Sequence, residues 1–149
     1  MLIETVRFGP LEVDETKILE FPDGLLGFPG CRRFALLQTS PDPVLFWMQS
    51  VDDPALAFVV CDPLDFVPDY QVPIRKDEVA ALGLEDLNDC QVLVIVNRVD
   101  GAYTANLLGP LVVGTQTRRG RQLVLSDKRY STRHRLMAVP EEHAVARSA

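Results

Sequence analysis

The sequence lacks the features that membrane-spanning, exported or disulfide-stabilised proteins need. No apolar run among its 149 residues approaches the ~18 consecutive residues of a transmembrane helix. The first residues, MLIETVRFGP, do not show the basic region followed by an apolar region that marks a secretory signal. Only three cysteines occur, Cys31, Cys61 and Cys90, and their wide spacing predicts neither a disulfide framework nor a zinc site. We therefore expect a cytoplasmic protein with three reduced thiols and no membrane association.

Histidine is equally scarce, which argues against nucleophilic catalysis. His134 and His143 are the only histidines, and the arginines beside His134 disfavour its protonated form without supplying an acid to orient it. No serine lies in a Gly-x-Ser-x-Gly motif, and the glycines at 24 and 27 precede a proline rather than a phosphate-binding helix. We expect no enzymatic activity and no cofactor. A hydrolase with scattered acids stays open, because only a structure would reveal such a site.

Short apolar segments separated by proline and glycine predict the fold. The hydrophobic content of 47% is enough for one core. One helix is predicted at about residues 75–82, with Gly83 as its left-handed C-terminal cap. We predict a mostly β, single-domain antiparallel β-barrel or sandwich over residues 1–138, and a flexible tail over 139–149. The expected strands are 2–8, 11–13, 18–21, 34–37, 46–51, 56–61, 91–98, 104–107, 111–113 and 121–125.

Charge is distributed unevenly along the chain. Residues 1–100 contain 18 acidic and 7 basic side chains, a net charge of −11, whereas residues 101–149 contain 3 and 8, a net charge of +5. An acidic surface suits a basic protein partner. The acidic segment 62–69 (DPLDFVPD) lacks the ligand spacing of a calcium loop. We predict instead a loop that is held to the core by the apolar side chains of Leu64, Phe66 and Tyr70.

The arginine-rich last third supports an alternative, an RNA-binding β-barrel. Its basic stretch begins at Arg118-Arg119-Gly120-Arg121 and would contact phosphates. Aromatic residues are sparse there, and only Tyr130 is available for stacking on bases. Composition and spacing therefore predict binding rather than catalysis, without naming the partner.

Several segments occur in the order and spacing of one known family. Over about residues 1–136 the chain resembles the family of the flagellar assembly factor FliW. The matching segments are FPDGLLGF at 21–28, FWMQSVDDP at 46–54, AFVV at 57–60, DP at 62–63, PDY at 68–70, TANL at 104–107, TRRGRQ at 117–122, Tyr130 and Arg133-His134. Arg135 stands where a proline is common in the family, so the resemblance does not define the path of the C-terminus.

The resemblance implies a small β-barrel-like protein with two protein partners. Members bind flagellin, the filament subunit, and the carbon storage regulator CsrA, a basic homodimer that represses translation of flagellin mRNA. Flagellin occupies the factor when it is plentiful, and after its export the factor binds CsrA and relieves repression. We expect a monomer when no partner is bound, and no direct contact with nucleic acid. A flagellin-only chaperone without CsrA antagonism remains the alternative within the family.

The family motifs divide into two sets of residues. Core packing and turns account for Phe21, Gly24, Gly27, Phe28, Trp47 and Phe58. Polar groups on or near loops are the better candidates for partner binding, namely Asp62, Asp65, Asp69, Tyr70, Thr104 and Asn106. Asn106 could equally satisfy backbone groups at a strand end.

Overall fold

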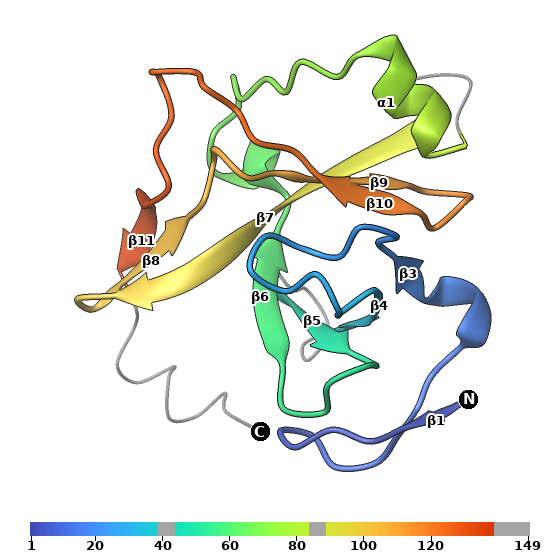
Figure 1. The fold of residues 1–149 in the computed structure, drawn as a ribbon. Helices are drawn as coiled ribbons and strands as arrows, with labels where there is room; N and C mark the ends of the chain where they lie inside the picture. The colour runs from blue at the N-terminus through green and yellow to red at the C-terminus, as the bar shows by residue number, and fades with distance from the viewer. Residues whose placement is uncertain (39–43, 84–88, 139–149) are drawn as a thin grey trace.

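The computed structural model describes residues 1–38, 44–83 and 89–138. Most of its secondary structure is short β-strand, with two single 3₁₀ turns and one α-helix (Figure 1). The strands are β1 (Leu2–Ile3), β2 (Leu11–Glu12), β3 (Leu19–Glu20), β4 (Arg33–Leu37), β5 (Phe46–Ser50), β6 (Ala57–Cys61), β7 (Cys90–Val99), β8 (Ala102–Ala105), β9 (Leu111–Gly114), β10 (Gly120–Gln122) and β11 (His134–Ala138). The helical elements are η1 (Glu15–Lys17), η2 (Pro63–Asp65) and α1 (Lys76–Ala81).

One curled antiparallel sheet forms the body of the molecule. Its strands follow the order β10-β9-β7-β6-β5-β4-β3, and β8 extends from β7 to carry β11. The long strand β7 crosses the whole molecule (Figure 1). Its first residues pair with β9 and its last residues pair with β8, so its two ends belong to different parts of the sheet. The result is a half-barrel, and a single bridge between Glu20 and Arg119 joins its two ends.

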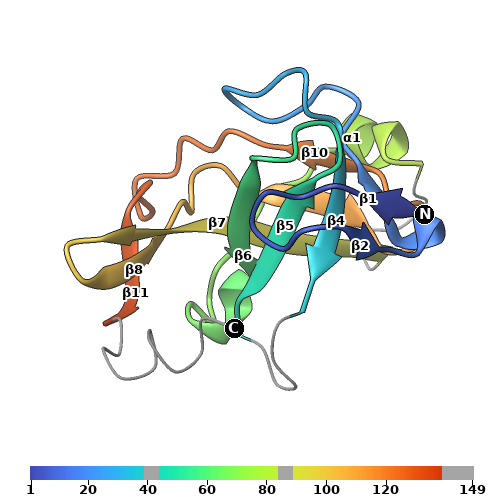
Figure 2. The same cartoon turned by 90° about the horizontal axis from the view of Figure 1, so that it is seen from below.

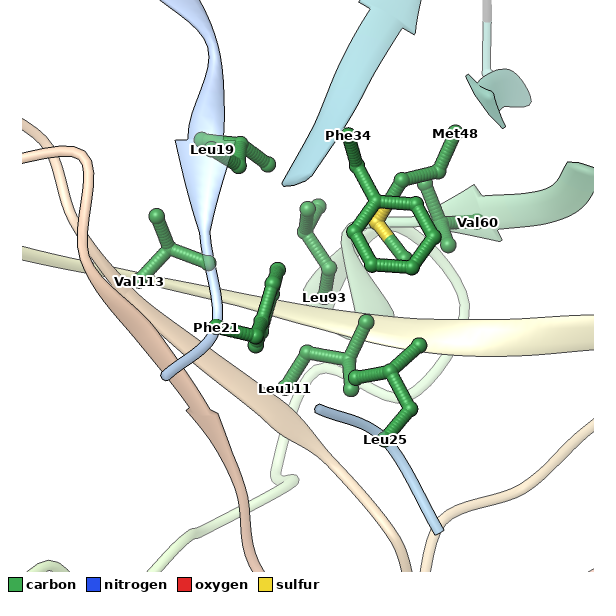
Figure 3. Close-up of a cluster of buried hydrophobic side chains, with 9 residues drawn as sticks. All are labelled: Leu19, Phe21, Leu25, Phe34, Met48, Val60, Leu93, Leu111 and Val113. Carbon is green, nitrogen blue, oxygen red and sulfur yellow. The ribbon is translucent and has the colours of Figure 1, made fainter. Parts of the chain in front are cut away.

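The strand β7 is apolar on both faces because it separates two cores. Successive side chains of a strand point to opposite faces. Leu93 therefore enters the core inside the curl (Figure 3), whereas Val94 enters a second core under the loop that follows β6. The inner core comprises Leu19, Phe21, Leu25, Phe34, Met48, Val60, Leu93, Leu111 and Val113.

The N-terminal hairpin of β1 and β2 covers the outer face of β5 (Figure 2). The ring of Phe8 meets the ring of Trp47 edge-on with centroids 5.7 Å apart. The guanidinium of Arg7 lies 4.3 Å from the centroid of the Trp47 ring, a cation–π contact. The backbone N–H of Val6 also donates to the carbonyl of Pro54. Through these contacts the N-terminal hairpin covers the outer face of the sheet at β5.

The structure confirms the predicted fold class and most of the predicted elements. The helix spans Lys76–Ala81, inside the predicted range, and Gly83 follows it with φ +74°. The expectation of a barrel or sandwich resolves to the curled half-barrel. Strand β11 was not predicted, because its sequence, HRLMA, shows no apolar alternation and its partner β8 is distant in the chain. The tail expected at 139–149 lies outside the described residues. No helix in the described part of the chain is long and apolar enough to span a membrane.

Candidate functional site

The segment from Asp62 to Tyr70, called the acidic loop below, begins at η2 directly after β6. Asp62 is the N-cap of η2, and its Oδ1 accepts the N–H of Leu64 at 2.9 Å. Its Oδ2 accepts a hydrogen bond from Gln91 Nε2 at 3.2 Å. The carboxylates of Asp65 and Asp69 are exposed, and neither forms an ion pair with any residue that the structure describes. The loop therefore keeps two carboxylates available for a partner.

Tyr70 anchors the end of the acidic loop inside the protein. Its hydroxyl donates to the carbonyl of Leu107 at 2.6 Å, and its ring lies 4.7 Å from that of Tyr130. Burial, together with the adjacent Tyr130, raises the pKa of the Tyr70 hydroxyl, so the hydroxyl remains a donor. This bond brings two sequence-predicted groups together, because it ties the acidic loop to the segment that carries Thr104 and Asn106.

Thr104 and Asn106 lie at the end of β8 in different environments. Thr104 is buried, and its Oγ1 has no hydrogen-bond partner among the described residues. Asn106 is half-buried, and its Oδ1 accepts the backbone N–H of Leu108 at 3.1 Å. Asn106 therefore satisfies a backbone N–H group at the end of a strand, which is one of the two roles expected for it from the sequence.

The apolar side chains of the acidic loop do not all face the core. Phe66 packs against the second core and Tyr70 belongs to it, but the side chain of Leu64 is 54% exposed. The prediction that Leu64 pins the loop is therefore wrong. Leu64 lies inside the 3₁₀ turn η2, where its side chain is exposed to solvent. An exposed leucine thus lies directly beside the carboxylate of Asp65.

The six motif residues assigned to the fold lie around the inner core and the outer face of the sheet. Phe21 is completely buried and meets Phe34 edge-on. Gly24 has φ +69°, and a Cβ there would lie 2.6 Å from backbone atoms of the following turn, so no other residue fits. Gly27 has φ +84°. Trp47 is half-buried under the N-terminal hairpin. Phe28 is 39% exposed and rests its ring on half-buried Phe58.

A basic group at the seam of the half-barrel was missed by sequence reasoning. Arg33 pairs with Glu20 in the sheet, and Glu20 bridges to Arg119, although these residues are far apart in the chain. Asp52 accepts the backbone N–H groups of Arg32 and Arg33 at 2.8 and 2.9 Å. Burial raises the pKa of Asp52, but these two donors and the Arg33 guanidinium lower it by more, so the net shift is downward. Only the sheet pairing could have revealed this group.

Two alternatives receive no support from the geometry. Within residues 1–38, 44–83 and 89–138, no three His, Cys, Asp or Glu side chains gather as a metal site would require. Tyr130, the residue proposed to stack on RNA bases, lies against Tyr70 and under the guanidinium of Arg129, 5.2 Å from its ring centroid. Its hydroxyl accepts the N–H of Gln71. Internal contacts thus occupy this aromatic side chain.

The fold and this surface define a small antiparallel β half-barrel with an exposed acidic loop. The family model described as FliW protein matches residues 2–136. The chain is 39% identical over 140 residues to the flagellar assembly factor FliW of Alkaliphilus metalliredigens, covering 92% of this chain and 86% of that one. It is 41% identical over 133 residues to that of Syntrophotalea carbinolica, covering 89% and 95%. A crystal structure of the flagellar assembly factor FliW superimposes with a TM-score of 0.82 at 33% identity, covering 95% of this chain and 99% of that one. The chain belongs to the FliW family of flagellar assembly factors.

Proposed function

We propose that this protein acts in the cytoplasm as a binding protein that alternates between flagellin and the translational regulator CsrA. Flagellin holds the protein while it accumulates, and CsrA then remains on flagellin mRNA. After flagellin is exported, the protein captures CsrA and translation resumes. The observation that carries the proposal, beyond family membership, is the exposure of the Asp65 and Asp69 carboxylates, neither of which forms an ion pair among the described residues.

Charge supports the acidic loop as the contact for CsrA, a basic dimer. Asp65 and Asp69 stand on a loop that is fixed at both ends, by the Asp62 cap and by the Tyr70 hydrogen bond. A fixed loop loses little conformational entropy on binding. Exposed carboxylates outside ion pairs attract a cationic surface and repel RNA phosphates within roughly 8–10 Å at physiological salt. The same loop can therefore attract the regulator and oppose its RNA.

Flagellin needs an apolar contact, because its terminal segments form amphipathic helices in the assembled filament. The exposed Leu64 supplies such a contact next to the carboxylate of Asp65. A helix that docked its apolar face on Leu64 would cover the neighbouring carboxylates. Binding of flagellin and of CsrA would then be mutually exclusive, which is the coupling that partner switching requires.

The test is co-purification of the protein with CsrA and flagellin from the same organism. Asp65→Asn with Asp69→Asn should weaken CsrA capture about tenfold, since two charge pairs of ~0.5–1 kcal/mol each are lost. Asp62 is left unchanged because it caps η2. The matched control, Glu4→Gln with Glu15→Gln, removes two exposed charges near the N-terminus and should leave capture unchanged. Leu64→Ser should weaken flagellin binding and spare the fold.

The outcomes separate the proposal from its alternatives. Capture of flagellin but never of CsrA indicates a flagellin-only chaperone, and capture of neither refutes the proposal. If the control variant loses CsrA as strongly as the loop variant, the acidic loop is not the contact. The rate of association with CsrA should also fall at least about tenfold as salt rises from tens to hundreds of millimolar. A salt-independent rate would remove the electrostatic part of the argument.

A further inference from the structure

The seam between β3 and β10 gathers arginines from both halves of the chain. Figure 1 shows β3 beside the β9–β10 hairpin. Glu20 is the Cα partner of Arg33 on one side and of Arg119 on the other. Residues that pair directly across a sheet place their side chains on the same face. The three side chains therefore form one row on one face of the sheet, with Glu20 at the middle position.

An open cleft of about 440 Å³ adjoins this row. Its lining residues are Glu20, Gly30, Arg32, Arg33 and Asp52. Asp52 already accepts the two backbone N–H groups of Arg32 and Arg33, and it lies 3.4 Å from the Arg33 guanidinium. The guanidinium groups of Arg32 and Arg119 form no ion pair within the described residues and are exposed. The arginines of the cleft and its edge, Arg32, Arg33 and Arg119, thus outnumber the carboxylates of Glu20 and Asp52 by one.

We propose that this cleft, with Arg119 at its edge, is a second docking surface that binds an acidic segment of a protein partner. Guanidinium groups bind carboxylates through paired N–H donors in a fixed planar geometry. The surface is formed by elements other than the acidic loop and has an excess of one positive charge. It therefore goes beyond the proposed alternation between two partners at the loop, and both surfaces can be occupied at once.

Two observations favour a protein segment over nucleic acid as the occupant. None of the described residues that line the cleft is aromatic, so these residues offer bases no ring to stack on. The first 100 residues carry a net charge of −11, and an extended polyanion that passed beyond the seam would meet this repulsion. A short acidic segment, unlike an extended nucleic acid, can contact the arginines without approaching the acidic remainder of the surface.

Fluorescence anisotropy tests the proposal with a labelled oligoglutamate peptide and a labelled oligouridine RNA of equal charge, at about 50 mM salt to limit screening. The intact protein should bind the peptide more tightly than the RNA. Arg32→Gln with Arg119→Gln should weaken peptide binding about tenfold. The control, Arg98→Gln with Arg133→Gln, removes the same charge from exposed positions at the β8–β11 end of the sheet. It should change the affinity by less than about twofold.

Glu20→Gln provides a test that misfolding cannot imitate. It removes the carboxylate between the two arginines and should tighten peptide binding about threefold, whereas a damaged fold would weaken it. The proposal is overturned if the peptide does not bind or if RNA binds more tightly than the peptide. It is also overturned if the two double arginine variants lose equal affinity for the peptide, or if Glu20→Gln has no effect. CsrA and flagellin take no part in this measurement, so its failure would leave the proposed function untouched.

Discussion

Replacement of Gly120 by alanine tests the closest packing in the inner core. A Cβ at Gly120 would lie 2.5 Å from Cε1 and 2.7 Å from Cζ of Phe21. Phe21 is completely buried and meets Phe34 edge-on, so its ring cannot swing into solvent. Overpacking of this kind lowers the free energy of unfolding by about 1–3 kcal/mol. The lower conformational entropy of the unfolded alanine variant raises it by about 0.4–1 kcal/mol. We expect a net loss of about 1.3 kcal/mol, or a Tm about 3–5 °C lower.

Thermal unfolding followed by circular dichroism measures this loss. Gly30→Ala is the matched control, because no atom lies within 4 Å of a Cβ at Gly30, and its Tm should stay within about 2 °C of the parent value. Phe21→Leu should partly relieve the crowding, so the double variant should be at least ~1 kcal/mol more stable than the sum of the single changes. A Gly120→Ala protein as stable as the parent, or strict additivity with Phe21→Leu, would refute the packing argument.

Two further predictions concern buried groups near the acidic loop. Tyr70→Phe removes the donor to the Leu107 carbonyl and should destabilise the protein by about 1–2 kcal/mol in urea unfolding; an unchanged midpoint would contradict the anchoring role. Burial, and then the charges of Asp65 and Asp62, raise the pKa of the Cys61 thiol from 9.0 to about 12. Because the unfolded chain releases this proton first, stability should fall as pH rises above about 9, and Cys61→Ala should show a smaller fall between about pH 8 and 10. Equal slopes would contradict this assignment.

Sequence reasoning succeeded where the signal was local. Helix α1 was predictable because good helix formers precede Gly83, whose positive φ closes the last turn. Strand β11 was not predictable, because it depends on pairing with β8, which is distant in the chain. The exposure of Leu64 was not predictable, because it depends on how the 3₁₀ turn η2 lies in the fold.

The candidate site shows the same division. Asp65 and Asp69 were found because acidic residues between prolines predict a surface loop. The seam cleft was invisible, since Arg33 and Arg119 become neighbours only when β3 and β10 bridge through Glu20.

The sequence by itself determined the β-rich class, the short strands, the helix and the excess of negative charge, because apolar alternation, turn residues and charge counts act locally along the chain. Only the tertiary structure decided that the sheet curls into a half-barrel and that Tyr70 holds the acidic loop against the end of β8. It also decided that arginines from both halves of the chain lie on either side of Glu20 at the seam. The physical reason is that strand pairing and side-chain burial join residues that local sequence patterns cannot relate.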